Sequence, residues 1–428
     1  MIQNMLLLHL SDIHFRAGQI GTAMDPNGHL RSELLRDAQV QCQRIGRAPD
    51  AVLVSGDIAF AGAKAEFEYA TDWLKTLCGA CGTTLGSVFV IPGNHDVVRS
   101  VASKPVVQSL HQSIKAAQPI ALNGIISGLL SDEDAKSALY EALGPYNTFA
   151  GQFFCDLLPP ERTRATRDLY FQDGSILRMT GLNSAFVSSA SDTPGSLFVD
   201  PASFQLERLP GVEHLVLCHH PYSWLGNGKA LSDFLHDVAR VHLFGHEHTN
   251  RILPARDFVS VAAGAAHPDH EEPNWEPGYN LLELEVEGVG TDRYLTVAVH
   301  VRVWQANPGQ FIAKQDRGAD AFQSRIALSP WIKPENTVVA QPAAAESTQA
   351  DAAAPEEGAD PMDSLRDISV RFFRLTVSQR SAIAGKLNLI EDEDANQPDF
   401  ERSRRVFLRA RERNLVEALD REVSAAGQ

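Results

Sequence analysis

Short apolar runs that end in polar or glycine-containing turns recur along the first part of the chain. They cover residues 6–10, 51–54, 88–91, 215–218 and 241–244. Runs of this length, bounded by turn residues, are typical of strands buried on both faces. Between the first three runs, residues 30–45 and 63–77 repeat apolar side chains at helical spacing. This alternation predicts parallel strands covered by helices, with functional residues just past the carboxyl ends of the strands.

The strand pattern lapses between residues 101 and 167. Residues 131–143 begin with Ser-Asp-Glu-Asp and continue with apolar residues at helical spacing, which is typical of a helix with an N-cap and first-turn carboxylates. The region therefore predicts a helical insertion, at about residues 101–167, that caps the functional site. Strand patterns return further on, at residues 176–180, 259–262, 281–286 and 294–304.

Composition divides the chain into three parts. Residues 1–330 carry the strand and helix patterns and are expected to form the first folded unit. Residues 331–361 are rich in Ala, Pro and acidic residues and predict a linker that lets its flanking units move independently. Residues 362–428 predict a small all-α domain, with helical spacing over residues 365–375, 378–389 and 399–423. This domain resembles small helical adaptor domains appended to bacterial conflict and signalling proteins, which implies a protein partner or self-association.

Composition also narrows the class of protein. A chain of 428 residues exceeds the usual size of a single core, and 44% hydrophobic with 21% charged residues is ordinary globular usage. The 38 basic and 54 acidic residues leave a net charge of −16, which argues against broad adhesion to nucleic acid or to an anionic membrane. Only five cysteines, and a first apolar run cut by Asp12, favour a cytoplasmic protein without a signal peptide or membrane span.

Ionisable or amide side chains follow each of the first five apolar runs at once. The clusters are Asp12-Ile-His14, Gly56-Asp57, Gly93-Asn94-His95-Asp96, His219-His220-Pro221 and Gly245-His246-Glu247-His248. Imidazole and carboxylate suit divalent cations such as Mn, Fe, Co, Ni and Zn, and the absence of cysteine from the clusters argues against a structural zinc site. The candidate ligands outnumber the needs of one ion and imply two: Asp12, His14, Asp57, Asn94, His219, His246 and His248. A two-metal site activates water and stabilises a phosphoryl displacement.

Five motifs occur in a fixed order over residues 9–248: Asp-x-His, Gly-Asp, Gly-Asn-His-Asp, His-x-Pro and Gly-His-x-His. In this order they resemble the calcineurin-like metallophosphoesterase superfamily. The resemblance implies an α/β fold in which two β-sheets stack face to face with helices outside. It also implies two divalent metal ions, with manganese expected first and iron, nickel, zinc and cobalt as alternatives.

The same resemblance distributes roles among the matched residues. One ion would be held by Asp12, His14, Asp57 and His248, and the other by Asp57, Asn94, His219 and His246. Asp57 would therefore bridge the two ions. His95 would contact the phosphate and assist the leaving group, and Asp96 would orient His95. The glycines before Asp57, Asn94 and His246 are expected to let the backbone turn sharply.

Three further side chains near the motifs have two interpretations each. Arg16 either binds phosphate or lies on the surface. Asn183 either touches substrate or is an ordinary turn residue. His220 is expected to face substrate or to be structural, and only as the alternative to ligate metal. In the C-terminal domain six arginines crowd residues 402–413, where an exposed or intrachain-paired face competes with binding to nucleic acid or an acidic partner.

The sequence therefore predicts a dinuclear-metal phosphodiesterase that acts on a nucleotide or nucleic acid. The ligand set does not separate cyclic-nucleotide phosphodiesterases from exonucleases, and the acidic net charge favours small nucleotides over long duplexes. The alternatives are a phosphomonoesterase or protein phosphatase, and a non-catalytic scaffold that binds partners. Retention of His95 and of every ligand argues against the scaffold. No extra basic cluster is evident near the ligands, so diesters are expected to outrank dianionic monoesters.

Overall fold

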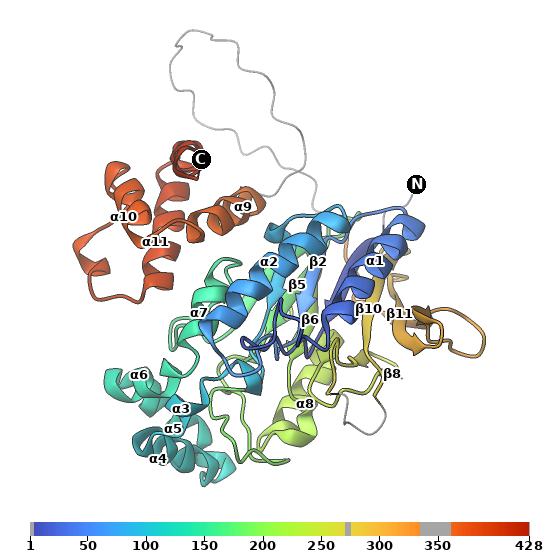
Figure 1. Cartoon of the computed structure of the whole chain (residues 1–428). Helices are drawn as coiled ribbons and strands as arrows, with labels where there is room; N and C mark the ends of the chain where they lie inside the picture. Colours follow the sequence, from blue (N-terminus) through green and yellow to red (C-terminus); the bar gives the residue numbers. More distant parts are fainter. Residues whose placement is uncertain (1–3, 270–274, 334–360, 428) are drawn as a thin grey trace, which may run out of the picture.

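The computed structural model of the chain describes residues 4–269, 275–333 and 361–427, so most of the predicted linker lies outside the described residues. Two mixed β-sheets form its centre (Figure 1). The first sheet has the strand order β12 (Gly309–Ala313), β11 (Tyr294–Ala306), β10 (Gly278–Glu287), β1 (Met5–Leu10), β2 (Ala51–Val54) and β3 (Val88–Val90), with β13 (Phe322–Ala327) also paired to β11. The second has the order β4 (Ala165–Tyr170), β5 (Ile176–Gly181), β6 (Val212–Cys218), β7 (Ala239–Phe244), β9 (Val259–Ala262) and β8 (Arg251–Pro254).

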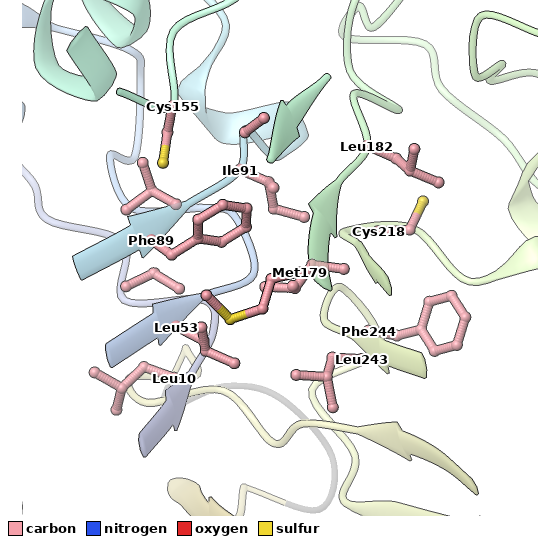
Figure 2. Packing of buried hydrophobic residues seen from close by; sticks show 14 of the residues in the cluster. Leu10, Leu53, Phe89, Ile91, Cys155, Met179, Leu182, Cys218, Leu243 and Phe244 are labelled. Atoms are coloured by element: carbon pink, nitrogen blue, oxygen red, sulfur yellow. The ribbon is translucent and has the colours of Figure 1, made fainter. Parts of the chain in front are cut away.

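Buried apolar side chains join the two sheets face to face. Figure 2 shows Leu10, Leu53 and Phe89 of the first sheet opposite Met179 and Leu243 of the second, and all five belong to one hydrophobic core. Strands β1, β2 and β3 run parallel, as do β5, β6, β7 and β9. Parallel strands buried on both faces carry continuous apolar runs, which explains why the sequence pattern found them. The predicted architecture of two stacked mixed sheets with flanking helices is confirmed.

Helices surround the sheets in the predicted order. Helices α1 (Gly28–Ile45) and α2 (Lys64–Ala80) follow β1 and β2, and α8 (Gly228–Val238) leads into β7. The insertion is helical, as α3 (Arg99–Ala102), α4 (Pro105–Lys115), α5 (Pro119–Ser131), α6 (Glu133–Glu141) and α7 (Gly144–Gly151). It is followed by β4, an edge strand that the sequence did not predict because its outward side chains are charged or exposed. None of the helices described is long and apolar enough to span a lipid bilayer.

The C-terminal region folds into helices α9 (Pro361–Phe373), α10 (Val377–Lys386), α11 (Asp399–Glu412) and α12 (Val416–Ala426). The single helix predicted over 399–423 is broken into two, because Asn414 adopts a left-handed φ of 54° and ends α11. Apolar side chains of the four helices form a common core, which includes Leu365, Ile368, Phe372, Phe407 and Leu419. The prediction of an all-α C-terminal region is confirmed.

This helical region packs against the rest of the protein, beside α2 and α7 (Figure 1). Phe154, which follows α7, enters the helical core, and its ring centroid lies 5.7 Å from that of Phe407. The fully buried carboxylate of Asp156 pairs with Arg404 at 3.1 Å, and Arg162 pairs with Glu401 at 3.0 Å. The expectation that the two units move independently is therefore wrong for this arrangement, because they share a hydrophobic core and buried ion pairs.

Most arginines in and next to α11 form ion pairs with carboxylates of the same chain. Arg405 pairs with Glu401 at 2.9 Å, and Arg409 pairs with Asp394 and with Glu393. Arg413, directly after α11, pairs with Glu391. Of the two interpretations of this basic stretch, intrachain pairing is the one that the structure shows.

Candidate functional site

The candidate ligands gather where the carboxyl ends of β1, β2 and β3 meet those of β6 and β7. Backbone hydrogen bonds join the loops that carry them. Asp12 N–H donates to Gly56 O at 3.1 Å, and His14 N–H donates to Asp57 O at 3.0 Å. In the second sheet, Gly245 N–H donates to His219 O at 3.0 Å. The site is thus assembled from the edges of two different sheets.

Five of the candidate ligands adopt a left-handed backbone conformation. Their φ angles lie between 51° and 69°, and the residues are Asp12, His14, Asp57, His246 and His248. This conformation costs roughly 1–2 kcal/mol for a residue with a side chain. Strained backbone of this kind concentrates at functional sites, where the surrounding structure holds it in place.

Two glycines let the loops approach one another. Gly56 has a φ of 96°, and a Cβ there would lie 2.6 Å from Nδ1 of His219. Gly93 has an extended backbone, with a φ of −110°, and a Cβ there would collide with Asp57. Of the three glycines expected at sharp turns, Gly56 has the positive φ, whereas Gly93 serves close packing against the Asp57 carboxylate and a Cβ at Gly245 would collide with Oγ of Ser11.

Asp57 lies between the site residues that come from the first sheet and those that come from the second. Its Oδ2 is 3.3 Å from Nε2 of His14 and 3.3 Å from Nε2 of His219, and its Oδ1 accepts a hydrogen bond from the His95 N–H at 2.7 Å. Burial raises the pKa of the Asp57 carboxyl, but His219 and His14 outweigh burial and hold the pKa well below its ordinary value. The carboxylate is therefore ionised between two imidazoles.

Around Asp57 the side chains that could donate a ligand atom to a metal ion form two groups. In the first, Oδ1 of Asp12 lies 3.2 Å from Nε2 of His248, close to His14. In the second, His219 donates from Nδ1 to Ser55 O at 2.8 Å, which turns its Nε2 toward Oδ1 of Asn94 at 3.2 Å. His246 lies beside it, with ring centroids 5.3 Å apart.

These donors fit divalent metal ions. Ligand atoms of Asp12, His14 and His248 all lie within 4.8 Å of one another, and so do those of Asp12, Asp57 and His219. Burial lowers the pKa of His219, but the Asp57 carboxylate outweighs burial and raises the pKa to about 9, so the buried carboxylates favour a positive charge at this position. Carboxylate oxygens and imidazole nitrogens at this spacing, buried together, are the donor set that such ions accept.

His95 and Asp96 lie at the site, but not in the predicted relation. The ring Nδ1 of His95 lies 2.8 Å from the carbonyl oxygen of Phe60, which orients the imidazole and leaves Nε2 for the site. The Asp96 carboxylate accepts hydrogen bonds from Ala59 N–H at 2.8 Å and Gly93 N–H at 2.9 Å. The prediction that Asp96 orients His95 directly is therefore wrong: both carboxylate oxygens are taken by backbone N–H groups of the site loops.

The other predicted residues are placed as follows. His220 is fully buried, with Nδ1 2.8 Å from Oγ of Ser184 and Nε2 3.0 Å from Oδ1 of Asn94. A ring nitrogen of His220 also lies within 4.8 Å of ligand atoms of His219 and His246, so the structure places His220 inside the second donor group. Asn183 accepts a hydrogen bond from Ala185 N–H at 2.9 Å, which is the geometry of a turn residue.

Several residues of the site were not identified from the sequence. Ser55 O and Phe60 O orient His219 and His95 through their backbone, which a sequence pattern does not reveal. Trp224 packs edge-on against His246, with ring centroids 4.2 Å apart. Arg99 approaches His95 from helix α3, and the signal for it was its position three residues after the Gly-Asn-His-Asp motif.

Stacked sheets whose strand ends collect imidazole and carboxylate donors are the architecture of metal-dependent phosphoesterases. Residues 5–250 match the family model described as calcineurin-like phosphoesterase, and the chain belongs to that family. The family uses divalent metal ions, which agrees with the donor groups described above. Residues 364–425 match the family model described as a GTPase-associated adaptor domain.

The chain is also similar to several solved structures. Vps29 from Chaetomium thermophilum is 11% identical with a TM-score of 0.30, over 76% of this chain and 98% of that one. Vps29 from Entamoeba histolytica complexed with zinc is 13% identical with a TM-score of 0.29, over 76% and 99%. A putative 5′-nucleotidase from Staphylococcus aureus is 10% identical with a TM-score of 0.36, over 79% and 56%. No curated protein matches the chain.

Proposed function

We propose that this protein is a dinuclear-metal phosphodiesterase that hydrolyses a nucleotide or nucleic-acid phosphodiester. The observation that carries the proposal is the position of Oδ2 of Asp57, 3.3 Å from Nε2 of both His14 and His219. A carboxylate oxygen between imidazoles of two donor groups has the place of a bridging ligand. The remaining ligands follow: Asp12, His14 and His248 complete one ion's set, and Asn94, His219 and His246 the other's.

Two divalent ions held here would lower the pKa of a bound water molecule and neutralise charge on the phosphoryl group. Side chains of the protein itself would transfer the proton and hold the site loops in place. Because Nδ1 of His95 donates to Phe60 O, His95 can protonate the leaving oxygen only as the imidazolium, which carries its second proton on Nε2. Burial lowers the pKa of His95, so the anionic phosphate beside the ring would have to favour that charged form. Asp96 holds the loops of Ala59 and Gly93 together and so fixes the position of His95.

A metal-reconstituted assay tests the reaction class. After addition of Mn²⁺ or Ni²⁺, the full chain is expected to hydrolyse bis-p-nitrophenyl phosphate faster than p-nitrophenyl phosphate at equal concentration, and chelator should abolish both activities. The diester carries one charge at the phosphate and needs less neutralisation than the dianionic monoester. A strong preference for the monoester would instead support the phosphomonoesterase alternative.

We further propose a division of labour in which residues 1–330 catalyse and residues 362–428 recruit a protein partner or a second copy. The match to an adaptor domain supports this, as does the position of every candidate ligand before residue 250.

Truncation before Pro361 tests that division. The shortened chain is expected to retain its metals and small-diester hydrolysis, but to unfold at a lower temperature, because Phe154 loses its cover and Asp156 loses Arg404. Exposure of one phenylalanine side chain costs about 2 kcal/mol, which lowers the melting temperature by roughly 4 °C. Thermal unfolding and metal analysis measure the two effects. Loss of turnover with the metals still bound would show that the helices form part of the catalytic site.

A further inference from the structure

An exposed guanidinium lies beside the proposed leaving-group histidine. Arg99 is the first residue of α3, and its Nη2 lies 3.3 Å from Nδ1 of His95. That nitrogen already contacts the carbonyl oxygen of Phe60 at 2.8 Å, to which it donates. Because a guanidinium has donors and no acceptor, Arg99 and His95 do not hydrogen-bond to each other in this arrangement. A hydrogen bond between the two side chains therefore does not explain why Arg99 lies beside His95.

The charge of Arg99 is not balanced within the part of the chain that the structure describes. No carboxylate among those residues lies within ion-pair distance of it. Two divalent cations at the neighbouring donor groups would repel a guanidinium placed here. Such a position becomes favourable when an anion lies against the guanidinium.

A second arginine adjoins the same surface. The Arg16 guanidinium lies 3.9 Å above the Phe60 ring, and the Phe60 ring centroid lies 5.2 Å from that of His95. Arg16 also pairs with Asp269 at 3.0 Å, at a site where both side chains are partly exposed. Arg16, Phe60, His95 and Arg99 thus form a continuous surface, the arginine rim, along the His95 side of the donor groups.

We propose that Arg99, assisted by Arg16, binds a second phosphate of the substrate, next to the one that is cleaved. The substrate is then a nucleotide chain, or a nucleotide with a further phosphate, in preference to a cyclic mononucleotide. Arginine is suited to this role because its planar fork binds phosphate oxygens in pairs. The proposal rests on the phosphodiesterase function proposed above and corrects the expectation that no extra basic group adjoins the ligands.

Two chromogenic diesters test the proposal with the metal-reconstituted full chain: the p-nitrophenyl ester of thymidine 5′-phosphate, and the same compound with an added 3′-phosphate. The added phosphate is expected to lower KM about tenfold, equivalent to ~1.4 kcal/mol, with little change in kcat. Arg99→Gln should remove most of that difference between the two compounds. Arg99→Lys should keep part of it, because it retains charge without the fork. Arg36→Gln, an exposed site on α1 that loses the same charge, should keep all of it.

Equal KM values for the two compounds in the unmodified chain, or a difference that survives in Arg99→Gln, overturn the proposal. So does an equal fall of kcat on both compounds in Arg99→Gln, because Arg99 would then act through His95.

Calorimetric binding of thymidine 3′,5′-bisphosphate and of thymidine 5′-phosphate gives a readout without turnover. About tenfold tighter binding of the bisphosphate, lost in Arg99→Gln, supports the rim, and equal binding overturns it. Absence of hydrolysis of both compounds would count against the phosphodiesterase function, and the binding comparison would still decide the role of Arg99.

Discussion

The Asp57→Asn variant is expected to fold and to lose most of its bound metal. Its rate of hydrolysis is expected to fall more than about 100-fold. Changes to residues that only support metal ligands cost about 10–100-fold, and Asp57 is proposed to bind both ions directly. A neutral amide compensates two cations poorly. Elemental analysis after reconstitution with Mn²⁺ should approach about two ions per unmodified chain and fall well below that in the variant.

Asp233→Asn is the matched control for this experiment. Asp233 lies exposed on α8, paired with Lys229, so its replacement makes the same chemical change away from the site. It should leave metal content and turnover as they are. Two metals bound with full activity in Asp57→Asn would contradict the bridging role.

His95→Gln is expected to keep both metals and lower turnover on an unactivated diester by about 10²–10⁴-fold, the usual contribution of general-acid assistance. The loss should be smaller for a p-nitrophenolate leaving group, which needs little protonation. Steady-state rates on the two kinds of leaving group, with metal analysis alongside, measure the difference.

His300→Gln provides the matched comparison for His95→Gln. His300 lies on β11 and pairs with Glu283 at 2.8 Å, within the first sheet. Its replacement should leave both rates unchanged. An equal loss on both leaving groups in His95→Gln would indicate that His95 positions the substrate and donates no proton.

Local residue patterns were sufficient to predict the central strands. The runs at 51–54 and 259–262 coincide with β2 and β9, because burial on one or both faces imposes its own apolar pattern. Strand β4 was missed, because an edge strand with exposed charges lacks that pattern. The predicted helix over 399–423 was divided by Asn414, whose left-handed backbone is a property of the folded chain.

For the site, the sequence alone determined which residue types follow each strand and in what order, because metal chemistry requires imidazole and carboxylate at the strand ends. Only the tertiary structure decided how those residues meet. It placed Asp57 between His14 and His219, since the two sheets stack with their carboxyl ends together. In the folded chain the carbonyl oxygen of Phe60, and not Asp96, orients the His95 ring, and Arg99 lies beside that imidazole. Contacts between backbone atoms and between distant segments leave no pattern in a sequence, which is the physical reason why these features emerged only in the fold.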